Sequence, residues 1–153
     1  MVRQLFRFQI LLRLRESERQ QRRSELAQAL EAERLLRAQL EVAGAELIAA
    51  RRHARDAAGP GPVNVDELLE YQRYVLRLQA QRTGIEQRCE QVQQEIERRR
   101  LVLVEADKQV RMLEKLRDRQ ELAERLDELR LEQKVLDEIG TRAAADPRRR
   151  HGG

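Results

Sequence analysis

The stretch AAGPGPVNVDELLEY, residues 57–71, divides the chain into two helices. The run Gly-Pro-Gly-Pro at 59–62 cannot continue a helix, because proline lacks the backbone donor and glycine weakens helical order. Asn64 is a preferred helix N-cap residue, and Glu67 follows three positions later, as in a capping box. The stretch predicts a first helix over about residues 2–57, a turn at 58–63 and a second helix from about residue 64.

The composition on either side of this turn is that of long helices. Of 153 residues, 38% are charged and 41% hydrophobic, but only 3% are aromatic and none is tryptophan. Large aromatic side chains supply much of the buried surface of a globular core, and they are nearly absent here. The balance of Leu, Ala, Glu, Gln and Arg instead indicates long or coiled helices.

The second helix carries a heptad repeat, which we count with Leu68 at position a. The a positions are Leu68, Val75, Arg82, Cys89, Ile96, Leu103 and Val110, and the d positions are Tyr71, Leu78, Ile85, Val92, Arg99, Ala106 and Leu113. Only Arg82 and Arg99 in this set are not apolar. Alternating spacings of three and four over seven heptads predict a coiled coil.

The first helix repeats leucine at multiples of seven residues, at Leu5, Leu12, Leu26, Leu40 and Leu47. Two amphipathic helices joined by a short turn form an antiparallel hairpin. With the turn centred near residue 61, the numbers of facing residues should add up to about 122. Leu12 would then face Val110, Leu26 would face Ile96, and Leu47 would face Val75. The predicted fold is all-α, one antiparallel coiled-coil hairpin over residues 1–140.

The heptad repeat of the second helix ends within MLEKLRDRQ, residues 112–120. On the same counting, residue 5 faces residue 117, so the second helix, predicted to end near residue 140, overhangs the first. This overhanging part carries a second apolar series in a shifted frame, which we call the leucine stripe: Leu122, Leu126, Leu129 and Leu136, with Ile139. Such a stripe indicates either a bent-back tail or dimer contact, or a surface for another protein. Residues 141–153 are predicted to be a disordered basic tail.

Residues with catalytic or metal-binding chemistry are scarce. His53 and His151 lack neighbours at metal-ligand spacing, and Cys89 occupies an a position, where it is expected to pack as a small apolar side chain. The only glycine-rich run alternates with proline, which excludes a phosphate-binding loop. We therefore expect no enzyme activity, no cofactor and no metal site.

The net charge of +4 does not indicate nucleic-acid binding. Residues 1–25 hold seven Arg and three Glu, and residues 141–153 hold four Arg and one Asp. The excess is thus at the two chain ends, and the chain between them carries −3, with no basic stripe along either helix. No apolar run is long enough to span a bilayer, so direct membrane insertion is not expected.

Four segments, in order, resemble the FliJ family of flagellar export proteins. They are FRFQILLRLRESE at 6–18, YQRYVLRL at 71–78, LVEADKQVRMLEKLRDRQ at 103–120 and EQKVLDEI at 132–139. The resemblance covers nearly the whole chain. The Gly-Pro-Gly-Pro turn and the Arg-rich first helix depart from the usual family pattern.

The resemblance implies a non-enzymatic stalk, similar to the central stalk of rotary ATPases. Such a stalk binds the hexameric flagellar export ATPase and the cytoplasmic domain of the export-gate membrane protein, promotes ATPase assembly, and helps to recycle export chaperones. By this analogy the gate side comprises Tyr71, Tyr74 and Leu78, and the ATPase side comprises Phe6, Arg7, Phe8, Leu116, Arg117, Arg119, Leu122, Leu126 and Leu129. The implied location is the cytoplasm, at the inner face of the cell membrane beneath the flagellum, in a protein that is mostly monomeric.

Two alternatives keep the same fold. The first is the corresponding stalk of an injectisome type III secretion system. The second is a structural coiled coil that self-associates through the leucine stripe of the overhanging helix.

Overall fold

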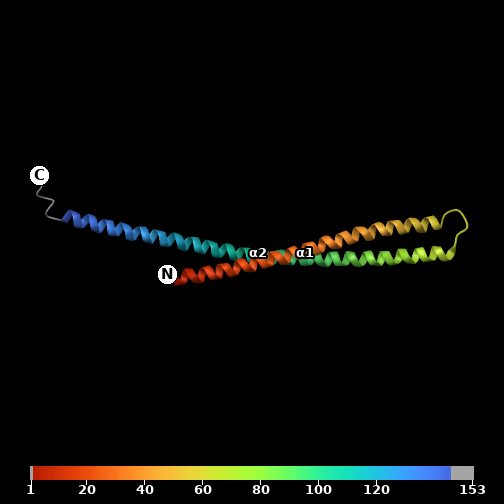
Figure 1. Ribbon diagram of the computed structural model, residues 1–153, viewed down its shortest axis with the longest axis horizontal. Helices are drawn as coiled ribbons and strands as arrows, with labels where there is room; N and C mark the ends of the chain where they lie inside the picture. Colours follow the sequence, from red (N-terminus) through yellow and green to blue (C-terminus); the bar gives the residue numbers. More distant parts are fainter. Residues whose placement is uncertain (1, 146–153) are drawn as a thin grey trace. The chain divides into compact units, whose positions relative to one another are not determined.

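The computed structural model describes the backbone of residues 2–145 and the side chains of residues 7–145. Two helices, α1 (Val2–Ala57) and α2 (Val65–Ala145), account for nearly all of this part, which contains no strand (Figure 1). They pack against each other as an antiparallel hairpin, which confirms the predicted fold class. Gly140, the predicted end of the second helix, lies inside α2, so residues 141–145 are helical and not part of a disordered tail. The rest of the predicted tail, 146–153, lies outside the described residues.

The turn between the helices is formed as its sequence predicts. The last turn of α1 tightens, since the Ala58 amide donates to the carbonyls of Ala54 and Arg55 at 3.2 and 3.1 Å. Gly61 has a φ of 151°, which residues with a side chain rarely adopt. The Asn64 side-chain oxygen then accepts hydrogen bonds from the amides of Asp66 and Glu67, at 3.2 and 3.5 Å. Asn64 is therefore the N-cap of α2.

The chain forms two compact units, one of residues Ser17–Asp107 and one of Met1–Glu16 with Lys108–Gly153. In the first unit, the a and d positions face the partner helix. From Leu68 to Ala106 they are all buried or half-buried except Arg82, which is exposed and pairs with Glu86 at 3.1 Å. The tightest cluster joins Leu47 and Ala50 of α1 to Leu78 of α2, with Val75 packed against it.

The register of the hairpin differs slightly from the expected one. The numbers of the paired residues Arg19 and Asp107 total 126, as do those of Glu33 and Gln93, while those of His53 and Tyr71 total 124. Helical side chains lean toward the N-terminus of their own helix. In α1 this direction leads away from the turn, and in α2 it leads toward the turn. A side chain of α1 therefore meets an α2 residue that lies slightly farther from the turn than predicted. The numbers of facing residues then total 124–126 instead of 122.

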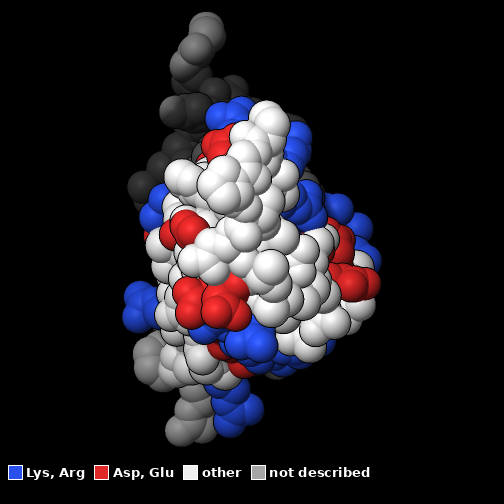
Figure 2. Space-filling model, turned by 90° about the vertical axis from the view of Figure 1, so that its right-hand side faces the viewer, with Lys and Arg blue, Asp and Glu red and all other residues white. Residues whose placement is uncertain are grey.

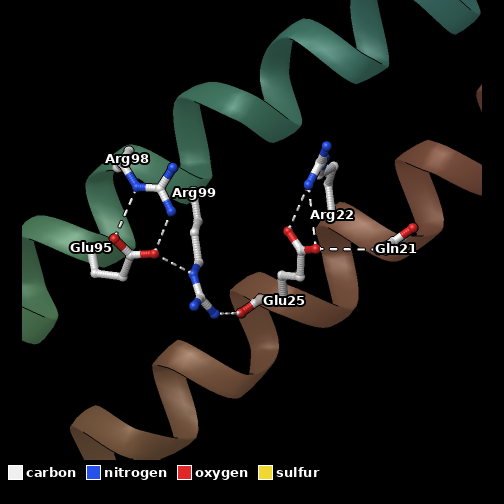
Figure 3. Close-up of polar contacts among 6 residues, drawn as sticks. All are labelled: Gln21, Arg22, Glu25, Glu95, Arg98 and Arg99. Carbon is white, nitrogen blue, oxygen red and sulfur yellow. Dashed lines mark hydrogen bonds and ion pairs between the residues drawn. The ribbon is translucent and has the colours of Figure 1, made fainter.

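Arg99, one of the two arginines in the heptad core positions, links the two helices. Its guanidinium donates to the backbone carbonyl of Glu25 in α1 and, through Nε, to Oε1 of Glu95 at 2.7 Å (Figure 3). Arg98 donates to the same carboxylate through two hydrogen bonds, of 2.9 and 2.6 Å. The side chain of Glu25 in turn accepts from Arg22 at 3.1 Å. This polar layer fills a d position that an apolar side chain would otherwise occupy.

The two arginines lower the pKa of Glu95 from an ordinary value of 4.5 to about 2. The largest cause is hydrogen bonding from Arg98, and the second is the hydrogen bond from Arg99. Because the folded-state pKa is depressed, the carboxylate stabilises the fold above pH 4.5 and loses this effect as the pH falls toward 2. We expect Glu95→Gln to lower the urea midpoint at pH 7 and to leave it nearly unchanged near pH 2. Glu90→Gln, at an exposed position of the same helix, is the control. A midpoint difference independent of pH would contradict the assignment.

In the second unit, the covered face of α2 changes from apolar to polar. Leu12 of α1 and Val110 of α2 are buried, with 6% and 0% exposed. The next heptad positions after Leu113 are polar, namely Arg117, Gln120 and Glu124, and they are half-buried. Every residue from 125 to 145 is exposed. We call residues 121–145 the overhang, because here α2 continues with all its apolar side chains exposed.

Candidate protein-interaction sites

The first candidate site lies beside the turn. Tyr71 is half-buried and stacks on His53 of α1, with ring centroids 6.3 Å apart and planes at 16°. Tyr74, three residues later, is 43% exposed, and the Arg77 guanidinium lies 5.8 Å from its ring centre. Figure 2, which looks onto the turn, shows uncharged side chains in the middle of this end and charged ones around them. Tyr74 thus presents an aromatic ring with a polar tip to solvent, as many protein-binding surfaces do.

A groove next to these tyrosines adds a hydrophobic surface that the sequence analysis missed. It has a volume of about 420 Å³ and is lined by Arg51, Ala54, Arg55, Gln72, Val75 and Leu76. Leu76 is 63% exposed and Leu69, one heptad earlier, is 43% exposed. Both occupy heptad position b, which normally faces solvent. The repeat of leucine at this outer position, one heptad apart, is the feature of the sequence from which this apolar surface could have been predicted.

Leu78, predicted to belong to the same partner surface, lies elsewhere. It is 4% exposed and packs in the core against Leu47 and Ala50. Its d position explains this, because d side chains insert between residues of the facing helix. Leu78 therefore holds the hairpin together beneath the tyrosines and does not present a surface of its own.

The second candidate site is the leucine stripe of the overhang. Leu122, Leu126 and Leu129 are 58%, 45% and 60% exposed. Leu136 and Ile139 are 67% and 59% exposed. Within the described residues, no other part of the chain buries these apolar side chains.

The stripe points away from the face of α2 that is shielded. Gln120 and Glu124 are half-buried, while Leu122 between them is exposed. Residues two apart on a helix lie on nearly opposite faces. The leucine stripe therefore does not extend the hairpin core: it is a separate surface on the other side of the helix.

The remaining residues predicted for this site lie near the start of α1 and on the neighbouring part of α2. Arg7 and Arg119 are exposed, Leu116 is 44% exposed, and Phe8 is half-buried. The side chain of Phe6 lies outside the described residues.

Arg117 is half-buried and bound by acidic neighbours. It donates to Oδ1 of Asp118 at 3.1 and 3.2 Å and lies 3.9 Å from a carboxylate oxygen of Glu121. The hydrogen bonds to Asp118 are the main reason that the pKa of Arg117 is raised above its ordinary value. Arg117 therefore remains a cation at the point where the leucine stripe begins.

Among the described residues, no group of three or more His, Cys, Asp or Glu side chains is placed to hold a metal ion. Within residues 2–145, neither helix includes a segment both long and apolar enough to cross a lipid bilayer. What the two units offer are exposed aromatic and aliphatic side chains on helix surfaces.

The chain matches the family described as flagellar FliJ protein over residues 4–149. The match spans nearly the whole chain, both helices and both candidate sites included. No curated protein and no solved structure gives a significant match. The family consists of structural adaptor proteins, not enzymes. The hairpin and its exposed surfaces are consistent with this family match. The match shows that the chain belongs to the flagellar FliJ family, as a component of the flagellar protein export apparatus.

Proposed function

We propose that this protein is a stalk and adaptor that binds the hexameric export ATPase through its overhang and the export gate through the surface beside its turn. The observation that carries the proposal is the leucine stripe, exposed along several turns of α2 and directed away from the shielded face of the helix. Contiguous exposed apolar surface of this kind marks protein-interaction sites.

On the ATPase side, the leucines Leu122, Leu126 and Leu129 supply the apolar contact. Arg117 and Arg119 lie just before the stripe, and Leu116 is exposed beside them. The start of α1 contributes Arg7 and Phe8 from the same compact unit, together with Phe6 of the same segment FRF. A helix on which two arginines are followed by exposed leucines suits the inside of a ring, because its surface can contact several subunits of the ring.

On the gate side, Tyr74 is the exposed anchor, Tyr71 supports it through the stack on His53, and Leu76 extends the apolar surface along the groove. Leu78 serves this site by packing the hairpin beneath it. The arginines around Tyr74 and the groove favour an acidic segment of the gate's cytoplasmic domain as the contact.

With one surface for the ATPase and another for the gate, the protein would couple ATPase assembly to export and release chaperones for re-use. It would work in the cytoplasm, associated with the inner face of the cell membrane at the flagellar base through its partners. Motility and chemotaxis depend on it in this view, because filament subunits leave the cell only through the export apparatus.

The decisive experiment measures hexamer formation and ATP hydrolysis by the export ATPase of the same organism, with and without the purified chain. We expect the full-length chain to promote both. A chain truncated after Gln120, which keeps the hairpin and loses the overhang, is the matched control and should promote neither. If the full-length chain leaves the ATPase unchanged, the proposed function is wrong.

A further inference from the structure

Two glycines lie inside the helices at positions where the fold does not require a glycine. Gly44 of α1 and Gly84 of α2 are both in regular helix, and neither has the positive φ of Gly61. A β-carbon added at either position would meet no atom within 4 Å, so close packing does not demand a glycine either. Glycine destabilises the interior of a helix relative to alanine, because it gains more backbone freedom on unfolding. Each glycine therefore weakens its helix locally.

The two glycines lie opposite each other in the hairpin. Their numbers total 128, close to the totals of 124–126 for residues that contact each other across the helices. Both glycines are half-buried. The weak points of α1 and α2 thus coincide at one level of the hairpin, residues 41–46 of α1 and 80–85 of α2, which we call the glycine layer.

The hydrophobic core is thin at the same level. Arg82 occupies heptad position a between the buried Leu78 and Ile85, but it is exposed and pairs with Glu86, so it adds no apolar side chain to the core. From α1, the buried side chain of this layer is only that of Ala43. Grooves of about 370 and 500 Å³ open here, the first lined by Ala43 and Ile85 among others, the second by Arg82 among others. Side chains therefore do not fill the glycine layer.

We propose that the glycine layer is a hinge, at which the turn end of the hairpin bends relative to the rest of Ser17–Asp107. Bends in helices have local causes, of which glycine is one, and here the weakened backbone coincides with a thin core in both helices. Gly84 lies 19 residues beyond Val65, the first residue of α2, which is about 29 Å at ~1.5 Å per residue. A bend of ~20° at the layer would thus move the turn by roughly 10 Å.

The hinge lies between the two candidate interaction sites along the chain. Tyr71, Tyr74 and their groove are on the turn side of the layer, and the leucine stripe is far beyond it on α2. Bending at the layer lets the turn end follow a moving partner while the overhang stays bound. The proposal rests on the glycine layer alone, so it does not depend on which proteins bind at either site.

The test measures residual dipolar couplings of the backbone amides by NMR in the full-length chain, weakly aligned in a liquid-crystalline medium. In a straight, rigid hairpin these couplings have the same average size on both sides of the layer. A hinge reduces them on the shorter, turn side, because motion averages the amide directions there. We expect the average coupling of residues 65–78 to be at least about 10% smaller than that of residues 89–106, as a wobble of ~20° produces.

The variant that replaces both Gly44 and Gly84 by Ala removes the hinge and keeps the fold, because both positions have room for a β-carbon. We expect the couplings on the two sides to become equal. Amides of residues 41–46 and 80–85 should also exchange with deuterium at least about fivefold more slowly, after correction for intrinsic rates. Gly140→Ala is the matched control, at an equally open position in the overhang, and should leave both measurements unchanged.

Three results would overturn the proposal. Couplings of equal size on both sides of the layer in the native chain would show that the hairpin is rigid there. Couplings that remain smaller on the turn side in the double alanine variant would show that the glycines do not cause the motion. Deuterium exchange in the layer that the two substitutions leave unchanged would contradict a local weakening by glycine.

Discussion

Replacing Leu122, Leu126 and Leu129 by serine is expected to weaken the proposed binding to the export ATPase strongly and to leave the thermal stability of the hairpin almost unchanged. All three side chains are exposed, so serine creates no cavity and removes no core contact. If a partner buries them, each contributes roughly 1.5–3 kcal/mol to the complex. Their joint loss should weaken binding by ~1,000-fold or more. A thermal melt of the free chain and a binding titration with the ATPase measure the two effects separately.

The matched control for this variant is the pair Leu101→Ser and Val104→Ser. These side chains are 72% and 51% exposed on α2, outside the overhang. They should affect neither the melt nor ATPase binding. If the melt of the triple serine variant collapses instead, its leucines are part of a core and the assignment of the stripe as a partner surface fails.

Leu78→Ala is expected to destabilise the hairpin by ~2–5 kcal/mol, as removal of a buried leucine side chain does. Leu78 is 4% exposed and belongs to the cluster with Leu47 and Ala50 that joins the two helices. Chemical denaturation of the purified chain gives the free energy of unfolding directly.

Leu76→Ala, two residues away, is the comparison that separates packing from partner binding. Leu76 is 63% exposed, so its loss should change the free energy of unfolding by less than ~0.5 kcal/mol. Under the proposed function it should weaken binding to the gate. If Leu76→Ala and Leu78→Ala destabilised the hairpin equally, the assignment of Leu78 to the core and of Leu76 to the exposed groove would be wrong.

The hairpin could be predicted from the sequence because its two determinants are local and periodic. Gly-Pro-Gly-Pro and Asn64 define the turn within a few residues, and the heptads from Leu68 onward identify the buried face. The exact register could not be predicted, because it depends on the lean of side chains in both helices. The end of α2 was also missed: Gly140 disfavours a helix only modestly, and the helix continues through Ala145.

The candidate sites were predicted less well. Heptad position identifies which side chains face the partner helix. On that basis Leu78 belongs in the core, while Leu76 and Leu69 face solvent. The motif YQRYVLRL drew attention to Tyr71, Tyr74 and Leu78 as a group, although they lie in different environments. The leucine stripe was found correctly as a feature, since a shift of frame along a helix rotates the apolar side chains onto another face.

The bond between Arg99 and the backbone carbonyl of Glu25 has a consequence for how the sequence can vary. A carbonyl is present whichever amino acid occupies position 25, so this tie between the helices does not depend on the partner's side chain. A substitution at position 25 that remains helical leaves the acceptor in place, whereas a change at position 99 removes the donor. In related chains, position 25 should therefore vary more widely than position 99, and position 99 should change only together with a rearranged core layer.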